Sequence, residues 1–346
     1  MLSRVAADIY WMNRYLERAE NYARFVDVNF NLALELHPDV KTQWEPLVTA
    51  TGDLGLYREL YPTVGRQPVV RFLGFDERNP NSVYNSVLKA RENARAIRSE
   101  ITKEVWEQIN QLYFYVREAR EQERWTENDP RAYFTDIRKG CQLVWGLYES
   151  TIAQSEGWHF SRIGRLVERA DKTSRILDIK YLLLAPKSGA SPTFDLVQWS
   201  ALLKSVSAYD MYKKRYGKLA ATQIVEFLLF SRRFPRSIFA CLLGVDASLR
   251  ALSPPGDAER LNRAQRKLGQ LRSQLEYSDV DEIMAAGVHE YLDRLQADLN
   301  DLSTALFETF FSVEVQRRSL HPPAKSMTQE QRGGGQSQSQ SQSRSS

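Results

Sequence analysis

The residues of this sequence best suited to chemistry are arginines and glutamates on a helical stretch near its start, "RYLERAENYARFVD". At about 100° per residue, the polar side chains of this stretch fall on one arc of a helix and the apolar ones on the opposite arc. The polar arc holds Arg14, Glu17, Arg18, Asn21 and Arg24. Arginine binds carboxylates and phosphates through its planar guanidinium, so this arc either holds an anion or pairs with other charged groups. Within the helix, the spacing predicts that Glu17 meets Arg14 and Asn21, and that Glu20 meets Arg24.

The same pattern returns in "RLVERADKTSRILD", where the polar arc holds Arg165, Glu168, Arg169, Lys172 and Arg175. Exposed pairs on one helix contribute only about 0.2–0.5 kcal/mol each, so stability alone is a weak reason to repeat them. If the arcs face inward, buried charges must be matched across helices. Three hypotheses remain open. The arcs bind an anionic peptide intermediate or dock a partner protein, they belong to an unfamiliar enzyme that uses Glu17 or Glu168 as general base, or they serve only as a structural scaffold.

A second candidate anion site lies at two predicted helix starts, where first-turn amides and short polar side chains can hold an anion. In "NPNSV", Asn79 is expected to cap a helix that begins at Pro80, and arginines follow at helical spacing. "FPRSI" occupies the corresponding place later in the chain. Ordinary capping is the alternative use of these residues. The candidate residues are Asn81, Ser82, Arg91, Arg95, Arg236 and Ser237.

Other catalytic machinery is not evident. A di-metal site in a helix bundle needs two ExxH pairs, and the sequence has one, Glu156 to His159, and only four histidines. There is no GxSxG, no phosphate-binding glycine loop and no zinc motif. Cys141 and Cys241 stand alone among apolar residues and are expected to be buried, inert thiols. We therefore expect no metal and no cofactor, and the sequence favours a protein that is not an enzyme.

The elements that position these residues are predicted to be helices almost throughout, which indicates an all-α bundle. Strand-like patterning is confined to the short "QPVVRFLGF". Pro80, Pro130 and Pro235 are expected in first helical turns, and Asp257 is expected to cap a helix. The expected helices cover about residues 3–35, 42–50, 53–61, 80–123, 129–155, 159–184, 194–204, 207–217, 219–231, 235–251, 256–276 and 279–316.

Three separated blocks recur in the same order and indicate an internal duplication. Besides the Arg/Glu stretch, "FLGFDERNPNSV" aligns with "FLLFSRRFPRSI". Between these blocks, Trp44, Leu47, Tyr57 and Tyr61 align with Trp199, Leu202, Tyr212 and Tyr216. We expect two similar helical halves, residues 1–156 and 157–318, that share one core. Residues 319–346 form a Gly/Ser/Gln-rich tail that is expected to be disordered.

Composition is that of a soluble globular protein: 42% of the 346 residues are hydrophobic and 26% are charged. The net charge of +4 is too mild to favour nucleic-acid binding. No apolar run approaches the roughly 18 residues that would predict a membrane span. The first residues lack the apolar core of a signal peptide, so a cytoplasmic location is expected.

The sequence also resembles the bacterial alpha-E domain proteins from residue 1 to about 318. The resemblance is carried by "MLSRVAADIYWMNRYLERAENYARFVDV", "FLGFDERNPNSVYNSVLKARENARAIRSEITKEVWEQINQLY", "IGRLVERADKTSRILD" and "VEFLLFSRRFPRSI". It implies an all-helical protein without an established activity. It also implies a pathway that forms amide or peptide bonds, because family members are encoded beside, or fused to, an ATP-grasp protein and a transglutaminase-like protein, which are the implied partners. Lys172, Thr173 and Ser174 replace Asn21, Tyr22 and Ala23 in the second copy, so equivalent sites would differ in chemistry.

Overall fold

The computed structural model describes residues 1–35, 44–127, 129–184, 192–253 and 261–312, and within these ranges it contains helices and no strand. The all-α prediction is therefore confirmed. None of the described helices has the length and apolar character needed to cross a membrane. The predicted tail at 319–346 and the predicted cap Asp257 lie outside the described residues.

Fifteen α-helices, one 3₁₀ turn and one π turn make up this described part, and residues 1–312 form one unit. The first set is α1 (Ser3–Glu35), α2 (Glu45–Thr51), α3 (Leu54–Leu60), α4 (Arg66–Gly74), α5 (Val83–Ala96), α6 (Lys103–Glu121), η2 (Arg124–Thr126) and α7 (Arg131–Thr151). The second set is α8 (Glu156–Leu184), α9 (Pro192–Ser205), α10 (Tyr209–Tyr216), α11 (Ala221–Phe230), α12 (Ile238–Ala251), α13 (Arg263–Glu276), α14 (Val280–Ala286), α15 (Val288–Leu306) and η3 (Phe307–Phe311).

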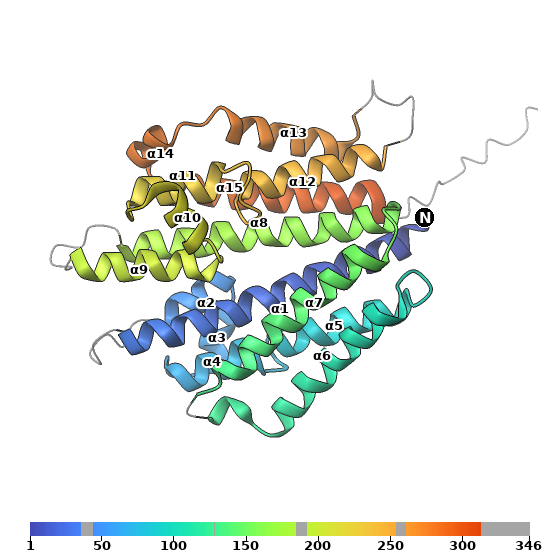
Figure 1. The fold of residues 1–346 in the computed structure, drawn as a ribbon, viewed down its shortest axis with the longest axis horizontal. Helices are drawn as coiled ribbons and strands as arrows, with labels where there is room; N and C mark the ends of the chain where they lie inside the picture. Colours follow the sequence, from blue (N-terminus) through green and yellow to red (C-terminus); the bar gives the residue numbers. More distant parts are fainter. Residues whose placement is uncertain (36–43, 128, 185–191, 254–260, 313–346) are drawn as a thin grey trace, which may run out of the picture. The chain divides into compact units, whose positions relative to one another are not determined.

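The long helices form two four-helix groups that meet through α1 and α8 (Figure 1). In one group α1 packs against α5 and α7, and α6 packs against the same two helices. In the other group α8 packs against α12 and α15, and α13 packs against both. Two further helices each contact the long central helix of the other group, since α2 packs on α8 and α9 packs on α1. The Arg/Glu stretches of α1 and α8 are therefore placed at the centre of the unit.

α1 and α8 run in the same direction, and they approach closely where Gly164 faces Tyr10 (Figure 1). A Cβ atom on Gly164 would lie 2.3 Å from the backbone oxygen of Tyr10, a distance that real Cβ contacts do not reach. Further contacts follow in the same order along both helices, from Glu168 with Arg18 to Lys172 with Tyr22, as expected for a parallel pair. Gly164 thus permits the separation at which the charged side chains of the two helices can interact.

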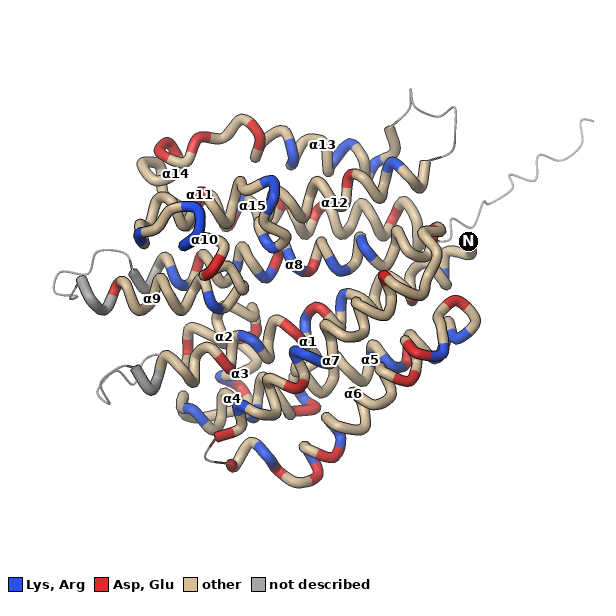
Figure 2. Tube along the Cα trace, in the orientation of Figure 1, with Lys and Arg blue, Asp and Glu red and all other residues tan. Residues whose placement is uncertain are grey.

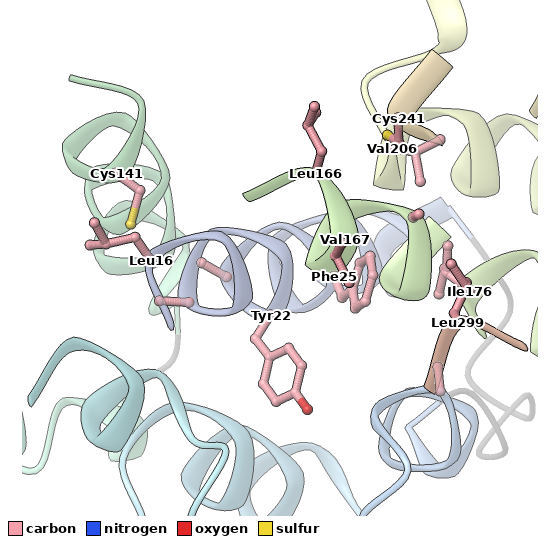
Figure 3. Packing of buried hydrophobic residues seen from close by; sticks show 14 of the residues in the cluster. Leu16, Tyr22, Phe25, Cys141, Leu166, Val167, Ile176, Val206, Cys241 and Leu299 are labelled. Atoms are coloured by element: carbon pink, nitrogen blue, oxygen red, sulfur yellow. The ribbon is translucent and has the colours of Figure 1, made fainter. Parts of the chain in front are cut away.

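The apolar arc predicted for each helix lies in the hydrophobic core (Figure 3). The buried members are Met12, Leu16, Ala19, Tyr22, Ala23, Val26, Ile163, Leu166, Val167, Ala170 and Leu177, while Tyr15 is partly buried against the same core. Every residue from Asn21 to Phe30 is buried. The polar arc of α1 is therefore covered as well as its apolar arc, and the covering elements include α8.

Several predicted helix boundaries are wrong. The single helix expected at 80–123 is two helices, because the chain turns between Ala96 and Lys103 and the Thr102 hydroxyl accepts a hydrogen bond from the amide of Val105 at 3.4 Å. "EVWEQINQLY" therefore belongs to α6 and does not continue α5. The strand-like segment after Gly65 is the helix α4.

Other differences have local causes. Asn79 does not cap α5, since this helix begins at Val83 with Ser82 as its cap, so Pro80 precedes the first turn. The helix expected at 256–276 begins instead at Arg263, where Asn262 and Gln265 form a capping box. The helix expected at 279–316 is interrupted at Gly287, whose φ of +114° is open to glycine and strained for other residues.

Candidate functional site

The Arg/Glu arcs of α1 and α8 face each other, and Glu168 is one of the two centres of the resulting network. The side chain of Glu168 has no exposed surface. Arg14 Nε donates to its Oε2 at 2.8 Å. Arg18 donates through Nε to Oε1 at 2.7 Å and through Nη2 to Oε2 at 3.1 Å, which is a bidentate pair. Lys172 Nζ lies 3.7 Å from Oε1, so three cations surround one buried carboxylate.

Glu17 is the second centre, and its contacts mirror those of Glu168. Its side chain is also fully buried. Arg169 of α8 donates through Nε to Oε1 and through Nη2 to Oε2, both at 2.8 Å. Arg236, from the residues that precede α12, donates to Oε1 at 3.2 Å, and Asn21 donates to the same oxygen at 3.0 Å. Each central glutamate is thus held by an arginine of the other long helix.

Glu20 extends the network to a third buried carboxylate. It accepts from Arg236 Nη2 at 2.9 Å and from Gln142 Nε2 at 3.3 Å, and it forms an ion pair with Arg24. Arg24 also donates to the hydroxyl of Ser207. The predicted pairs Glu20–Arg24 and Glu17–Asn21 are therefore confirmed.

The predicted contact between Arg14 and Glu17 is wrong. Arg14 reaches across to α8, where it binds Glu168, and it also donates to Tyr10 at 3.1 Å. A residue three positions away on the same helix is a close neighbour, but a bidentately held carboxylate on the facing helix competes for the same guanidinium. Glu17 is equally buried, but Arg169 and Arg236 already donate to it, so the Arg14 guanidinium is available to compensate the charge of Glu168.

The electrostatics of the site keep both central glutamates ionised. Burial by itself would raise the pKa of Glu17, but Arg169 and Arg236 more than offset it and hold that pKa below its usual value. Burial likewise opposes ionisation of Glu168, and Arg18, Arg14 and Lys172 together lower its pKa well below its usual value. A carboxylate in this state has little affinity for a proton, which general-base catalysis requires.

The remaining predicted members of the arcs lie at the edge of the network. Arg165 donates to Glu149 at 2.9 Å instead of binding a central glutamate. Arg175 pairs with Asp171 at 2.9 Å, and Lys172 reaches the same carboxylate at 3.0 Å. Apart from pairs within α1 and within α8, the contacts of the Arg/Glu arcs among the described residues are ion pairs and hydrogen bonds between elements, as expected of a structural network.

The structure divides the second candidate group between two places. Arg18 Nη1 donates to Asn81 Oδ1 at 2.8 Å, so Asn81, like Arg236, belongs to the central network. Arg91 turns instead towards Asn110 of α6, with Nε 2.7 Å from Oδ1, and Arg95 pairs with Glu92 at 2.6 Å. The arginines of α5 therefore do not gather at the start of that helix.

Ser82 and Ser237 cap their helices from buried positions. The Ser82 hydroxyl accepts from the amide of Asn85, and the Ser237 hydroxyl accepts from the amide of Ala240, both at 3.2 Å. Neither side chain has exposed surface. The capping alternative thus accounts for both hydroxyls, while anion binding at these helix starts stays a prediction.

Sequence reasoning did not include Glu20 and Asp171 among the site residues. The two residues occupy the same place in the repeated stretch, next to the alanine that follows each Glu-Arg pair, and this shared position is the signal that could have identified them. Asp27 and Asp178 are a second such pair. Arg138 binds Asp27 at 2.9 Å, and His289 Nδ1 lies 2.7 Å from Asp178.

The cysteines are buried as predicted, and Figure 3 places them on different helices. Burial raises the pKa of the Cys141 thiol, and it raises the pKa of Cys241 to about 12. Both side chains are therefore protonated thiols at neutral pH, and the nucleophilic form of cysteine is the thiolate.

Comparison with known proteins gives a family match and distant relatives. The curated relatives include an uncharacterized protein of Mycobacterium bovis and two of Mycobacterium tuberculosis. Each is 24% identical over 332 residues, an alignment that covers 88% of this chain and 36% of the relative. The chain thus spans about a third of the length of the curated relatives it matches. No solved structure matches.

The family model Alpha-E matches residues 1–311 and is described as a predicted alpha-helical domain with a conserved ER motif. Two Glu-Arg dipeptides of this chain, Glu17-Arg18 and Glu168-Arg169, lie at the centre of the network described above. The match covers nearly all of the described residues. The chain belongs to the Alpha-E family.

Proposed function

We propose that this chain is a non-catalytic helical partner protein in which Glu17-Arg18 and Glu168-Arg169 lock two duplicated halves together. The observation that carries the proposal is the reciprocal binding of Glu17 and Glu168, each fully buried and each held bidentately by an arginine of the facing helix. Such carboxylates are unavailable to a substrate and are poor general bases. A buried carboxylate that is fully paired instead specifies which helices meet and in what register, a role that we assign to this network.

The proposed duplication is supported by packing as well as by the repeated sequence. α1, α5, α6 and α7 contact one another in the pattern that α8, α12, α13 and α15 follow. The crossing contacts also match, because α2 lies on α8 and α9 lies on α1. We infer that residues 1–156 and 157–318 are equivalent halves that share one core, and that neither half buries its Arg/Glu arc alone.

The partner that we propose is an ATP-grasp ligase of a pathway that forms amide or peptide bonds. The resemblance to alpha-E proteins implies this association, with a transglutaminase-like protein as a further partner. The coverage of the relatives agrees with such a role, since 36% of each relative aligns with this chain and the rest of its length is additional sequence. A unit that occurs within longer proteins is suited to work beside another domain or subunit.

Co-purification tests the partnership. The full chain and an ATP-grasp ligase from the same organism are co-expressed, one of them tagged, and purified at low salt under reducing conditions. We expect a stoichiometric complex that survives size-exclusion chromatography. A ligase that elutes alone would refute the partnership while leaving the structural role of the network untouched.

A pair of variants separates the structural role of the network from binding. Glu17→Gln and Glu168→Gln are expected to lower the free energy of unfolding, and folded variants are expected to bind the ligase with unchanged affinity. If either variant keeps wild-type stability but loses the ligase, the network is a binding site and the structural proposal fails. If the wild-type protein alone turns over a substrate and the variants do not, the general-base alternative is correct.

A further inference from the structure

A cavity of about 650 Å³ lies outside the central network, between α10, α11 and the residues that follow α11. This volume is within the range of sites that hold a small organic ligand. Its wall combines flat apolar rings with guanidinium groups: Tyr216, Phe227, Phe230, Arg215, Arg232 and Arg233. The arginines are exposed, so the cations stand at the mouth of the cavity.

A second cavity, of about 540 Å³, is lined by residues that occupy matching positions in the repeated block. Tyr61, Phe75 and Arg78 line it where Tyr216, Phe230 and Arg233 line the first cavity. The choice of these matched positions rests on the duplication proposed above, whereas the charge of each cavity is independent of it.

The second cavity supplies its own anions. The Asp76 carboxylate accepts from Arg78 Nε at 3.0 Å, from Arg78 Nη2 at 2.7 Å and from the Tyr61 hydroxyl at 2.6 Å. Arg120 pairs with Glu77 at 2.7 Å. Two of its arginines are thus neutralised by carboxylates of the chain itself.

The first cavity lacks these anions. Ser231 stands at the position of Asp76, and Arg232 stands at the position of Glu77. Among the described residues, Arg233 has no acidic partner, while Arg232 pairs with Glu276 at 2.6 Å. Glu226 lines the cavity, but its Oε2 lies 3.4 Å from the Tyr216 hydroxyl and forms no ion pair in the described part of the chain.

The surroundings of the first cavity strengthen this difference. Residues 204–233 contain seven lysines and arginines against two carboxylates, whereas residues 49–78 contain four against four. Lysine and arginine segments lie at and beside α10 (Figure 2). Arg71 of the second cavity also has no carboxylate partner among the described residues, so the two cavities differ in degree. Because a concave basic surface concentrates anions, we expect the first cavity to attract anions more strongly than the second.

We propose that the cavity beside α10 and α11 binds a small organic anion with a flat apolar ring, whose oxyanion takes the place that the Asp76 carboxylate fills in the second cavity. Arg233 and Arg215 hold the oxyanion, and the ring lies against Phe227 and Tyr216. A phosphate or a carboxylate supplies the oxyanion, and the test separates the two. This ligand site does not depend on the partnership with the ligase proposed above.

Titration of the full chain with phenyl phosphate, benzoate and inorganic phosphate, followed by calorimetry and NMR, tests the proposal. We expect saturable binding of phenyl phosphate or benzoate, tighter than that of inorganic phosphate because the ring adds apolar contact. The tighter of the two organic anions identifies the oxyanion. Binding weakens with added salt, since exposed charges are screened.

Matched variants locate the site. Arg233→Ala is expected to weaken binding about tenfold, whereas Arg78→Ala in the second cavity leaves it unchanged. Ser231→Asp gives the first cavity the carboxylate that Asp76 provides in the second, and it is expected to weaken ligand binding at least as much as Arg233→Ala. All three positions lie at cavities near the surface, and thermal unfolding verifies that the variants are folded.

Three results would overturn the proposal. One is the absence of saturable binding at about 10 mM of either organic anion, which is weaker than the affinity of a specific small-ligand site. Another is binding that Arg233→Ala and Ser231→Asp leave intact. The third is equal loss of binding in Arg233→Ala and Arg78→Ala, which would place the ligand elsewhere or show a general charge effect.

Discussion

Replacing Glu168 with glutamine should destabilise the protein strongly without changing its shape. The substitution keeps one carbonyl oxygen but removes the charge that holds Arg14 at 2.8 Å, Arg18 at 2.7 Å and Lys172 at 3.7 Å. These three cations would then crowd around a neutral amide in a place that water does not reach. Removing one partner of a buried ion pair typically costs about 3–5 kcal/mol.

The expected loss is near the lower end of that range, about 3 kcal/mol, because the glutamine amide still accepts one hydrogen bond. The unit spans residues 1–312. At an unfolding entropy of about 2.1 cal/mol/K per residue, each kcal/mol lowers the melting temperature of a unit this large by about 1.5 °C, so a fall of roughly 4–5 °C is expected. Urea unfolding followed by far-ultraviolet circular dichroism measures the free energy, and a thermal scan measures the melting temperature.

Glu107→Gln is the matched control, since Glu107 pairs with Lys103 at 3.5 Å and its side chain is 60% exposed. An exposed pair contributes about 0–1 kcal/mol, so this control should barely change stability. If Glu168→Gln loses no more stability than the control, the central network does not stabilise the contact between α1 and α8. A double-mutant cycle with Arg18→Met should give a coupling energy of about 0.5–3 kcal/mol, and a value near zero would also contradict the reasoning.

Three further predictions concern pH, packing and a buried lysine. The two central glutamates have pKa values below the usual 4.5. Their contribution to protein stability is therefore complete above that pH and is lost as the pH falls towards the folded-state pKa values. Between about pH 5 and pH 2, the urea midpoint should fall less steeply in Glu168→Gln than in the wild type. Gly164→Ala should destabilise the protein by about 1–3 kcal/mol, because the added Cβ would lie 2.3 Å from the Tyr10 backbone oxygen. Gly146→Ala, where the added Cβ meets open space, should instead stabilise the protein by about 0.5–1 kcal/mol. Urea unfolding of both variants measures the two changes, and equal effects would disprove the close approach. Burial lowers the pKa of Lys180 to about 8 from 10.5, so protein stability should rise with pH between these two values. Lys180→Met should be more stable than the wild type at pH 7, and its stability should lack that rise in matched pH titrations.

Helical class and the position of the polar arcs were predictable because they depend on local periodicity. A side chain turns about 100° per residue, so the sequence alone separates Glu17 and Asn21 from Leu16 and Ala19. The contact between Glu17 and Asn21 follows from the same geometry and is present at 3.0 Å. Breaks between helices were harder to predict where no proline or glycine marks them. Between Ala96 and Lys103 the sequence is compatible with a helix, but the packing of α5 against α6 requires the chain to turn.

The choice of partner for each charge was not predictable from spacing. Arg14 binds a glutamate of α8 and not its own neighbour Glu17. Arg165, at the aligned position of the second Arg/Glu stretch, binds Glu149. The two Arg/Glu stretches therefore differ in their contacts although their sequences align, because the elements packed around each arc are different. Arg236 reaches Glu17 and Glu20 from far along the chain, which only the packing of α12 on α8 makes possible.

The sequence by itself determined that this protein is helical, that two stretches carry a Glu-Arg pair on a polar arc, and that each arc has an apolar side for a core. These properties are local, since the twist of one helix sets them. Only the tertiary structure decided that the two arcs bury each other. That outcome depends on the close approach of α1 and α8 at Gly164, and on the large cost of leaving a buried charge unpaired, which selects partners across the interface.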